Sequence, residues 1–308
     1  MPNNPPIINA APAAAALQAS AGQPAAPAQD GLFSDLAALR AELDRIDNGI
    51  HALLIERAHI VEYVARSGKP AAFRPGREAA IIRRLLAQHE GRLPRQTLFG
   101  VWRELLAGTT AMQGPFLVAV AADGTSDSLT QLAREHFGAL TPLRVLGSAG
   151  QALNEVHNGN AAVAVLPFPM GGDQARSPWW TALLRLDQRL YINARLPFWT
   201  PRPDGAPNAQ ALVVASTPPD ASGEDRSFLA LELDADVSRA RIASELGNAG
   251  LPPEAIVVSR EAGTTEAQVL VEVAGALGED DPRLAALGRV LRRPVVLGGY
   301  AVPVGGTV

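Results

Sequence analysis

The hydrophobic residues between Leu32 and Arg66 recur in alternating steps of three and four, which is the spacing of one face of a helix. That face consists of Leu36, Leu39, Leu43, Ile46, Ile50, Leu53, Ile60 and Val64. At ~1.5 Å per residue the helix is roughly 50 Å long, which exceeds what a compact domain needs and favours packing against a partner chain. Position 57 falls on the same face but holds Arg57. A guanidinium among apolar side chains is costly unless an anion meets it, so the pattern indicates a functional cation.

Two shorter helices are expected after the first one. Pro75 suits the first turn of a helix that extends to His89, and a third helix runs from Pro94 to Gln113. Their inward faces comprise Ile81, Ile82, Leu85 and Leu86 on the second helix and Leu98, Trp102, Leu105 and Leu106 on the third. Residues 31–114 are therefore predicted to form an all-helical domain, with Ser34 or Asp35 as the cap of its first helix.

The period changes at Gly114-Pro115, after which short apolar runs alternate with helical segments. We expect strands at 116–122, 143–146, 161–166, 190–196 and 211–215, and helices at 128–137 and 151–157. This alternation is typical of a parallel α/β sheet. Pro218–Asp225 breaks the pattern, and the last unit has the ferredoxin-like order βαββαβ. Its elements are expected at 228–233, 237–249, 255–259, 268–273, 282–290 and 295–302.

Composition excludes several classes of function. A net charge of -4 argues against a protein that coats nucleic acid or an anionic membrane, and no apolar run approaches the ~20 residues that span a bilayer. The absence of cysteine excludes disulfides, thiolate metal sites and cysteine nucleophiles. Residues 1–30 lack the basic start and leucine-rich centre of a signal peptide, so we expect a disordered leader on a cytoplasmic protein.

Polar side chains occupy the apolar faces of all three predicted helices. Arg57 lies on the first, Glu78 shares the face of Ile82 on the second, and Thr109 and Gln113 continue the apolar series of the third. Taken alone, each of these four residues is more simply explained as a polar side chain at a helix edge that extends into solvent or pairs with a neighbour. Together they indicate a dry, cationic pocket for a small polyanion that carries a hydroxyl. The sequence offers no Ser/His pair, metal-ligand cluster or Gly-rich phosphate loop, so we expect no metal or cofactor and a chemistry of electrostatics and positioning.

A further arginine of the long helix faces elsewhere. Arg40 lies seventeen residues before Arg57, about 260° around the helix at ~100° per residue. Two arginines so placed cannot point into the same pocket from one straight helix. Arg40 can join such a site only if it serves the pocket of another chain.

The segments 39–50, Glu56-Arg57, Arg74-Pro75-Gly76-Arg77-Glu78 and Thr109 to Gln113 resemble the all-helical class of chorismate mutase. The resemblance covers residues 32–113 and implies an intertwined dimer of three-helix chains. It also implies conversion of chorismate to prephenate, an intramolecular Claisen rearrangement without covalent or acid–base steps. Catalysis in that class selects the reactive chair conformer and stabilises charge on the breaking ether oxygen.

The resemblance assigns roles to individual residues. Arg57 and Arg40 of the partner subunit would grip the two carboxylates of the substrate, with Arg77 nearby. Glu78 would hold the ring hydroxyl, and Gln113 would donate to the ether oxygen.

Some positions depart from the family pattern. Thr109 stands where the family often has serine, and Arg74 occupies a position that is often acidic. The family places a lysine eleven residues after the position of Arg57, where this chain has Gly68. Lys69, the only lysine of the chain, comes one residue later. If the chain turns at Gly68 so that Lys69 points into the site, its ammonium would donate to the same ether oxygen. The alternative is that Lys69 is a loop residue exposed to solvent.

The second half is similar to a prephenate dehydratase with its regulatory ACT domain, which implies a periplasmic-binding-like α/β region at 115–222 and an ACT-like unit at 226–304. Phe168-Pro169-Met170 stands where that family carries Pro-Ile-Glu-Asn-Ser, and Ala209-Gln210-Ala211 where it carries a catalytic Thr-Arg-Phe. Ser259-Arg260 keeps the middle of the Glu-Ser-Arg-Pro effector motif. We therefore expect no dehydratase activity, and a region that supports dimerisation or binds an aromatic amino-acid effector.

Two hypotheses follow for the whole chain. The first is a multidomain, dimeric chorismate mutase, an isomerase of aromatic amino-acid biosynthesis with a non-catalytic C-terminal region. The second is a regulatory or scaffold protein that kept the helical dimer and partners another shikimate-pathway enzyme. Gly68 favours the second hypothesis. The retained polar residues favour the first hypothesis, because a protein that has lost its function is expected to lose several buried polar residues together. We therefore prefer the enzyme.

Overall fold

A computed structural model describes residues 35–67, 73–122, 127–170, 178–260 and 263–305. Residues 1–30, Gly68 and Lys69 lie outside these ranges, so the predictions for the leader and for the lysine stay predictions. The chain divides into two compact units, residues 1–60 and residues 61–308.

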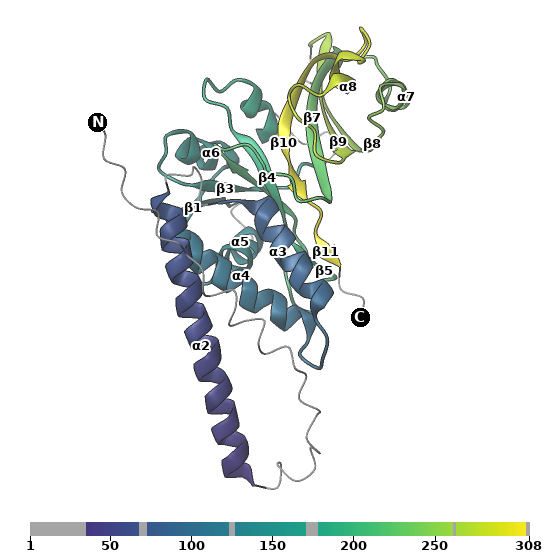
Figure 1. The fold of residues 1–308 in the computed structure, drawn as a ribbon. Helices are drawn as coiled ribbons and strands as arrows, with labels where there is room; N and C mark the ends of the chain where they lie inside the picture. Colours follow the sequence, from purple (N-terminus) through teal and green to yellow (C-terminus); the bar gives the residue numbers. More distant parts are fainter. Residues whose placement is uncertain (1–34, 68–72, 123–126, 171–177, 261–262, 306–308) are drawn as a thin grey trace, which may run out of the picture. The chain divides into compact units, whose positions relative to one another are not determined.

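The first unit contains most of helix α2 (Leu36–Arg66), drawn in purple in Figure 1. Asp35 caps it as predicted, because its side chain accepts a hydrogen bond from the Ala37 amide at 2.9 Å. The helix contains no buried residue, and its apolar face is exposed along its length. Leu36, Leu43, Ile46, Ile50, Leu53, Ile60 and Val64 all belong to that exposed face. An apolar stripe of this length requires a covering surface in solution.

The second unit begins with helices α3 (Pro75–Gln88) and α4 (Arg95–Ala111), close to the predicted ranges. Their buried faces are rotated from the predicted ones. Ile82, Leu86 and Leu106 are buried, but Ile81, Leu85, Leu98, Trp102 and Leu105 are only half-buried. Phe99, Arg103, Leu106 and Thr110 instead form the fully buried face of α4. The reason is that the α/β region packs on this face, which helical periodicity alone does not reveal.

A nine-stranded sheet forms the centre of the second unit, in the order β2-β1-β3-β6-β4-β10-β7-β9-β8. Its first half contains β1 (Val118–Ala121), β2 (Leu143–Leu146), β3 (Val163–Pro167), β4 (Tyr191–Leu196) and β6 (Ala211–Ala215). Helices α5 (Ser128–Phe137) and α6 (Ala149–His157) connect β1, β2 and β3, which are parallel. Because β6 is antiparallel to both β3 and β4, the sheet is mixed, and the predicted parallel arrangement is found for β1, β2 and β3 but not for β6. A 3₁₀ helix, η1 (Trp179–Leu184), lies between β3 and β4.

The second half of the sheet confirms the predicted βαββαβ order. It consists of β7 (Asp225–Asp234), α7 (Arg239–Asn248), β8 (Pro253–Arg260), β9 (Glu266–Ala274), α8 (Pro282–Ala285) and β10 (Arg292–Ala301). The strands lie in the order β10-β7-β9-β8 and are antiparallel. Helix α8 is shorter than the predicted 282–290.

The two halves share one sheet because β10 pairs with β4 through Gly298 and Ile192. A Cβ at position 298 would lie 2.3 Å from the Ile192 carbonyl oxygen, and Gly298 has a φ of +111°. Only glycine accommodates both the close approach and this backbone conformation. After this joint, β11 (Val304–Gly305) pairs with β5 (Trp199–Thr200) beside α3 (Figure 1).

Candidate functional site

Glu78 and Arg103 form a buried ion pair between α3 and α4. The Glu78 carboxylate accepts a hydrogen bond from Arg103 Nη2, and both side chains are at least nine-tenths buried. Arg103 lies four residues after Phe99 and three before Leu106, so it occupies the buried face of its helix. The enclosed space beside the pair is about 10 Å³, room for one water at most. This space is therefore too small for an organic ligand.

The polar residues of α4 bond to their own helix. The Thr109 hydroxyl donates to the carbonyl oxygens of Leu105 and Leu106, each at 3.0 Å. The Gln113 Nε2 donates to the Thr109 carbonyl oxygen at 3.1 Å. Thr109 lies in the last turn of α4, whereas Gln113 follows the end of the helix, which is two residues short of the predicted Gln113.

The predicted cations lie on different parts of the chain. Arg77 is exposed at the first turn of α3, one residue before Glu78. In the first unit, Arg57 is half-buried and Arg40 is exposed. The described chain thus brings Arg77 and Glu78 together on α3, and Gln113, just beyond the end of α4, bonds back to Thr109.

His136 of α5 lies against the Glu78–Arg103 pair and is 5% exposed. Neither ring nitrogen has a hydrogen-bond partner within the described part of the chain. Burial, followed by the repulsion of the Arg103 guanidinium, holds the pKa of His136 well below its usual range. The imidazole is therefore neutral at physiological pH.

Sequence reasoning missed Arg103, His136 and Asp220, all of which contact the segment that carries Arg77 and Glu78. Arg103 could have been found by the argument that singled out Arg57, because it interrupts the apolar face of α4. Asp220 and His136 follow only from tertiary packing, which no local pattern encodes.

A second candidate site is a cleft of about 530 Å³ at the carboxyl ends of β1 and β3. It is lined by Ser128, Ser148, Pro167, Ala209 and Gln210 among other neutral residues. Of the positions compared with dehydratase motifs, Ala209 and Gln210 line this cleft, whereas Phe168, Pro169 and Met170 line a different pocket. None of the described residues that line the cleft has an ionisable side chain.

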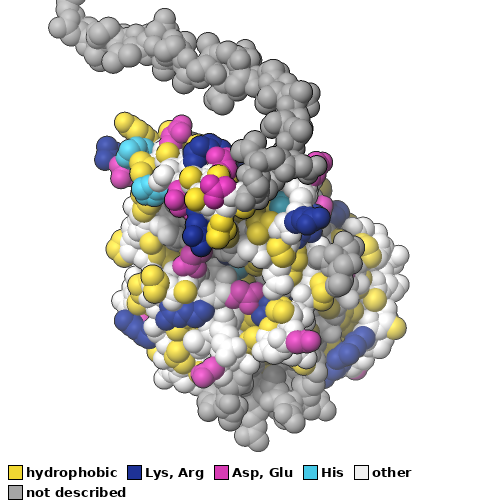
Figure 2. All heavy atoms as spheres, turned by 90° about the horizontal axis from the view of Figure 1, so that it is seen from below, with side chains coloured by type: hydrophobic (Ala, Val, Ile, Leu, Met, Phe, Trp, Pro, Cys, Tyr) yellow, Lys and Arg dark blue, Asp and Glu magenta, His cyan; other side chains and the backbone are white. Residues whose placement is uncertain are grey.

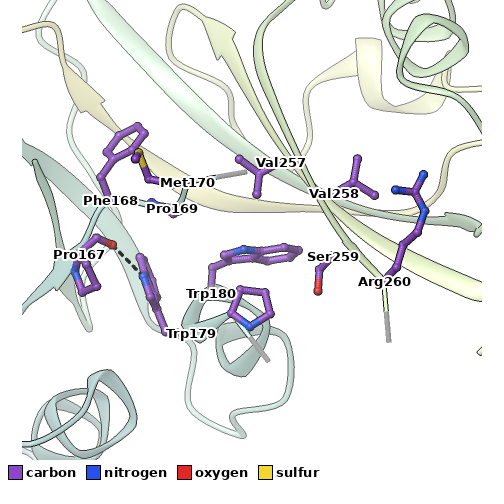
Figure 3. Close-up of a pocket in the computed structure, with 11 residues that line it drawn as sticks. Pro167, Phe168, Pro169, Met170, Trp179, Trp180, Val257, Val258, Ser259 and Arg260 are labelled. Atoms are coloured by element: carbon purple, nitrogen blue, oxygen red, sulfur yellow. Dashed lines mark hydrogen bonds between the residues drawn. The ribbon is translucent and has the colours of Figure 1, made fainter. Parts of the chain in front are cut away.

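A third candidate site is a pocket of about 210 Å³ between the end of β3, η1 and β8. Figure 3 shows Phe168, Trp179 and Trp180 opposite Val257, Val258 and Ser259. Arg260 is the last residue of β8. Its Nε donates to the Ala235 carbonyl oxygen at 2.9 Å and its Nη2 to the Val237 carbonyl oxygen at 3.3 Å. The predicted effector residues Ser259 and Arg260 thus border a largely apolar, aromatic pocket.

Arg195 of β4 lies between these two cavities. Its guanidinium stacks over the Phe168 ring at 4.6 Å and donates to the Tyr300 hydroxyl at 2.8 Å and to Gln210 Oε1 at 3.0 Å. Tyr300 in turn donates to the buried Glu272 carboxylate. Burial first, and then Glu272, raises the pKa of Tyr300 to about 12. This polar network spans the joint between the two halves of the sheet.

The described residues provide no candidate metal site. Within the described ranges, His, Asp and Glu side chains form no group of three or more that could hold a metal ion. Acidic and basic side chains are interspersed over the face drawn in Figure 2. No described helix has the length and hydrophobicity needed to cross a membrane.

Comparisons with known proteins show which families the chain resembles. Residues 39–114 match the family described as chorismate mutase type II. The chain is 28% identical over 141 residues to the bifunctional chorismate mutase/prephenate dehydratase of Pseudomonas aeruginosa, which covers 43% of this chain and 38% of that protein. It is 29% identical over 130 residues to the protein of the same name from Neisseria gonorrhoeae, which covers 42% of this chain and 35% of that one.

Solved structures resemble the chain more distantly. Prephenate dehydratase from Streptococcus mutans has a TM-score of 0.46 at 15% identity and covers 61% of this chain and 98% of its own. A protein titled GqqA, a novel type of quorum quenching acylase, has a TM-score of 0.46 at 18% identity and covers 61% of this chain and 96% of its own. These likenesses are too distant to define a function.

The family match identifies the helical N-terminal segment as a mutase domain. Residues 39–114 carry a chorismate mutase type II domain. The predicted family is thereby confirmed, and the relatives combine that mutase with a prephenate dehydratase. The chain spans well under half of the length of these relatives.

Proposed function

We propose that the protein is a chorismate mutase, an isomerase that rearranges chorismate to prephenate. The observation that carries this proposal is the match of residues 39–114 to the type II family, a segment that holds Arg40, Arg57, Arg77, Glu78 and Gln113. In the rearrangement the ether C–O bond breaks as a C–C bond forms, so no oxidant, cofactor or proton donor is required.

In the proposed site, cations orient the substrate and a carboxylate fixes its ring. Arg57 and Arg40 of the partner subunit bind the two carboxylates, with Arg77 close by. Glu78 accepts a hydrogen bond from the ring hydroxyl. A carboxylate has about four lone-pair positions, so the bond to Arg103 leaves acceptor capacity for the substrate. These contacts select the reactive conformer, and such positioning supplies up to about 7–11 kcal/mol of a barrier.

Stabilisation of the ether oxygen is the second part of the mechanism. Gln113 turns its amide from the Thr109 carbonyl toward the substrate, and Lys69 supplies an ammonium to the same oxygen. A donor of this kind contributes roughly 3–4 kcal/mol to the transition state. Thr109 lines the pocket beside Gln113.

We propose a homodimer formed through α2. Its support is the apolar face of that helix, which is exposed from Leu36 to Val64 in the single chain. Because Arg40 and Arg57 face different directions on one helix, a site that uses both requires two chains.

Purified protein incubated with chorismate tests the proposed activity. We expect loss of the ultraviolet absorbance of chorismate together with formation of prephenate, and Arg57→Ala serves as the control for contaminating host enzyme. Conversion no faster than in that control contradicts the proposal. Lys69→Ala then tests the lysine separately: a rate constant equal to that of the unaltered protein removes Lys69 from the mechanism.

We propose that the C-terminal region, a dehydratase-like unit at 115–222 and an ACT-like unit at 226–304, does not dehydrate prephenate. The support is the neutral lining of the cleft at Pro167, Ala209 and Gln210. Incubation with prephenate at neutral pH should yield no phenylpyruvate above a blank without protein. Its formation contradicts this part of the account.

The aromatic pocket beside Ser259 and Arg260 favours a second, regulatory function. Its indole and phenyl walls suit a planar ring, and Arg260 suits a carboxylate, so we expect an aromatic amino acid as effector. Calorimetry with phenylalanine and tyrosine tests this expectation. Absence of heat with both removes these candidates.

The alternative hypothesis is a mutase-like protein with little catalysis that partners another enzyme of the shikimate pathway. The glycine at position 68, where the family has lysine, is the feature that favours it. Slow turnover combined with acceleration of another shikimate-pathway enzyme would support the alternative over the isomerase.

A further inference from the structure

Helix α3, which carries Arg77 and Glu78, begins without a cap of its own. Arg74 occupies the N-cap position but makes no side-chain hydrogen bond to the helix. The first amides of a helix have no partner within the helix and need one from elsewhere. Here the partner is 144 residues away in the sequence.

Asp220, from the segment between β6 and β7, supplies the missing cap. Its Oδ1 accepts from the Gly76 amide at 2.9 Å and its Oδ2 from the Arg77 amide at 3.0 Å. The Arg74 guanidinium lies 3.4 Å from the same Oδ2. A carboxylate at this end of a helix is also favoured by the helix dipole.

The approach of the two segments depends on a residue without a side chain. A Cβ at position 76 would lie 2.0 Å from the Asp220 carbonyl oxygen. Because backbone atoms cannot give way as a flexible side chain can, only glycine permits the contact. Gly76 and Asp220 thus form a matched pair.

The segment that carries Asp220 also forms hydrogen bonds with α3 two turns further along the helix. Arg83 donates to Ser222 Oγ at 2.8 Å, to the Glu224 carbonyl oxygen at 3.0 Å and to the Val302 carbonyl oxygen at 2.6 Å. Ser222 is itself fixed by a hydrogen bond from its hydroxyl to Asp225 at 2.6 Å. Helix α3 is therefore held at two points by residues 220–225.

We infer that Asp220 is a positioning residue through which the α/β region fixes Arg77 and Glu78 for the mutase site. The inference rests on the proposed function. Asp220 bonds directly to the Arg77 amide, and Glu78 is the next residue in the same turn. Because a misplacement of about 1 Å costs about 100-fold in rate, loosening this turn reduces turnover without removing a substrate contact.

Variants of the full chain test the inference by two measurements. Asp220→Ala should speed amide exchange in a peptide covering residues 74–80 and lower kcat for chorismate about 10- to 100-fold. Asp220→Asn keeps one of the two acceptor oxygens, so it should restore part of the exchange protection and part of kcat. Asp204→Ala, an exposed acidic residue of the same region, is the matched control and should change neither.

Two results would overturn the inference: slow exchange retained in Asp220→Ala, or fast exchange with kcat and KM unchanged. A fall in kcat together with the melting temperature, which Asp220→Asn does not reverse, would indicate only a structural role. If the unaltered protein does not convert chorismate, the proposed function is wrong, and so is the part of the inference that concerns catalysis. The exchange result still decides whether Asp220 fixes α3.

Discussion

At the scale of single residues, the buried charges around Glu78 lie where the mutase helices α3 and α4 pack against the α/β region. Glu78 comes from α3, Arg103 from α4 and His136 from α5. An ion pair with so little access to water is stable only when both partners are present. The neutral histidine beside it fills space without adding charge.

Removal of one partner of this pair should be strongly destabilising. Arg103→Ala leaves the Glu78 carboxylate buried without its cation, and we expect a loss of about 3–5 kcal/mol in the free energy of unfolding. Urea unfolding followed by circular dichroism measures this change. Arg95→Ala, at the exposed start of the same helix, is the control. Equal stabilities of the two variants would contradict the assignment.

His136 should make the protein sensitive to mild acid. Its pKa in the folded state lies below the ordinary value near 6.5, because the charged form is desolvated and faces Arg103. As pH falls through about 6.5, the unfolded chain binds a proton that the folded chain does not, so the free energy of unfolding decreases.

Urea unfolding at pH 7.5 and pH 5.5 measures this effect. His136→Leu should lose less stability between the two values than the unaltered protein does. His157→Ala, which removes a half-buried histidine paired with Asp187, should retain the sensitivity. If all three proteins lose the same stability, His136 is not its source.

At the scale of elements, the sequence predicted most helices and strands but not how they combine. Helix α5 and strands β2 and β6 have the predicted bounds, because each is a short amphipathic or apolar run with clear breaks at both ends. The reversed direction of β6 and the joint at Gly298 could not be predicted, since they depend on pairings between distant segments. Glu78 and Thr109 are buried on α3 and α4, while the contacts of Arg103 and Asp220 could be found only from the tertiary structure.

The joint between the two halves of the sheet should depend on glycine at position 298. Gly298→Ala places a methyl group against the Ile192 backbone in a conformation that disfavours a side chain. We expect a loss of at least about 1–3 kcal/mol in stability. Gly278→Ala, where nothing lies within 4 Å of the added carbon, is the matched control. A melting temperature equal to that of the control would contradict this account of the joint.

The exposed face of α2 should be the dimer interface. Leu53→Glu places a charge on that face and should convert a dimer into a monomer in sedimentation equilibrium, because a buried unpaired carboxylate is costly. Asn48→Glu changes the opposite face of the helix and should leave the dimer intact. Dimers that persist in Leu53→Glu at micromolar concentration would place the interface elsewhere.

At the scale of the whole molecule, the chain joins a type II mutase domain to an α/β region that contacts it directly. Asp220 and Arg83 connect the two, and Phe99 of α4 packs on Trp199 at a ring distance of 5.4 Å. The α/β region therefore has a structural part in the proposed mutase, separate from any chemistry of its own cleft.

The most direct test of the central claim is complementation between two inactive variants. In the proposed dimer each site contains Arg57 of one chain and Arg40 of the partner subunit. Arg40→Ala and Arg57→Ala should each lack mutase activity alone. Unfolded together and refolded as a mixture, they should regain about a quarter of the activity of the unaltered protein, since half of the dimers then hold one intact site. No activity in the mixture, with mixed dimers demonstrated by mass spectrometry, would contradict the shared site.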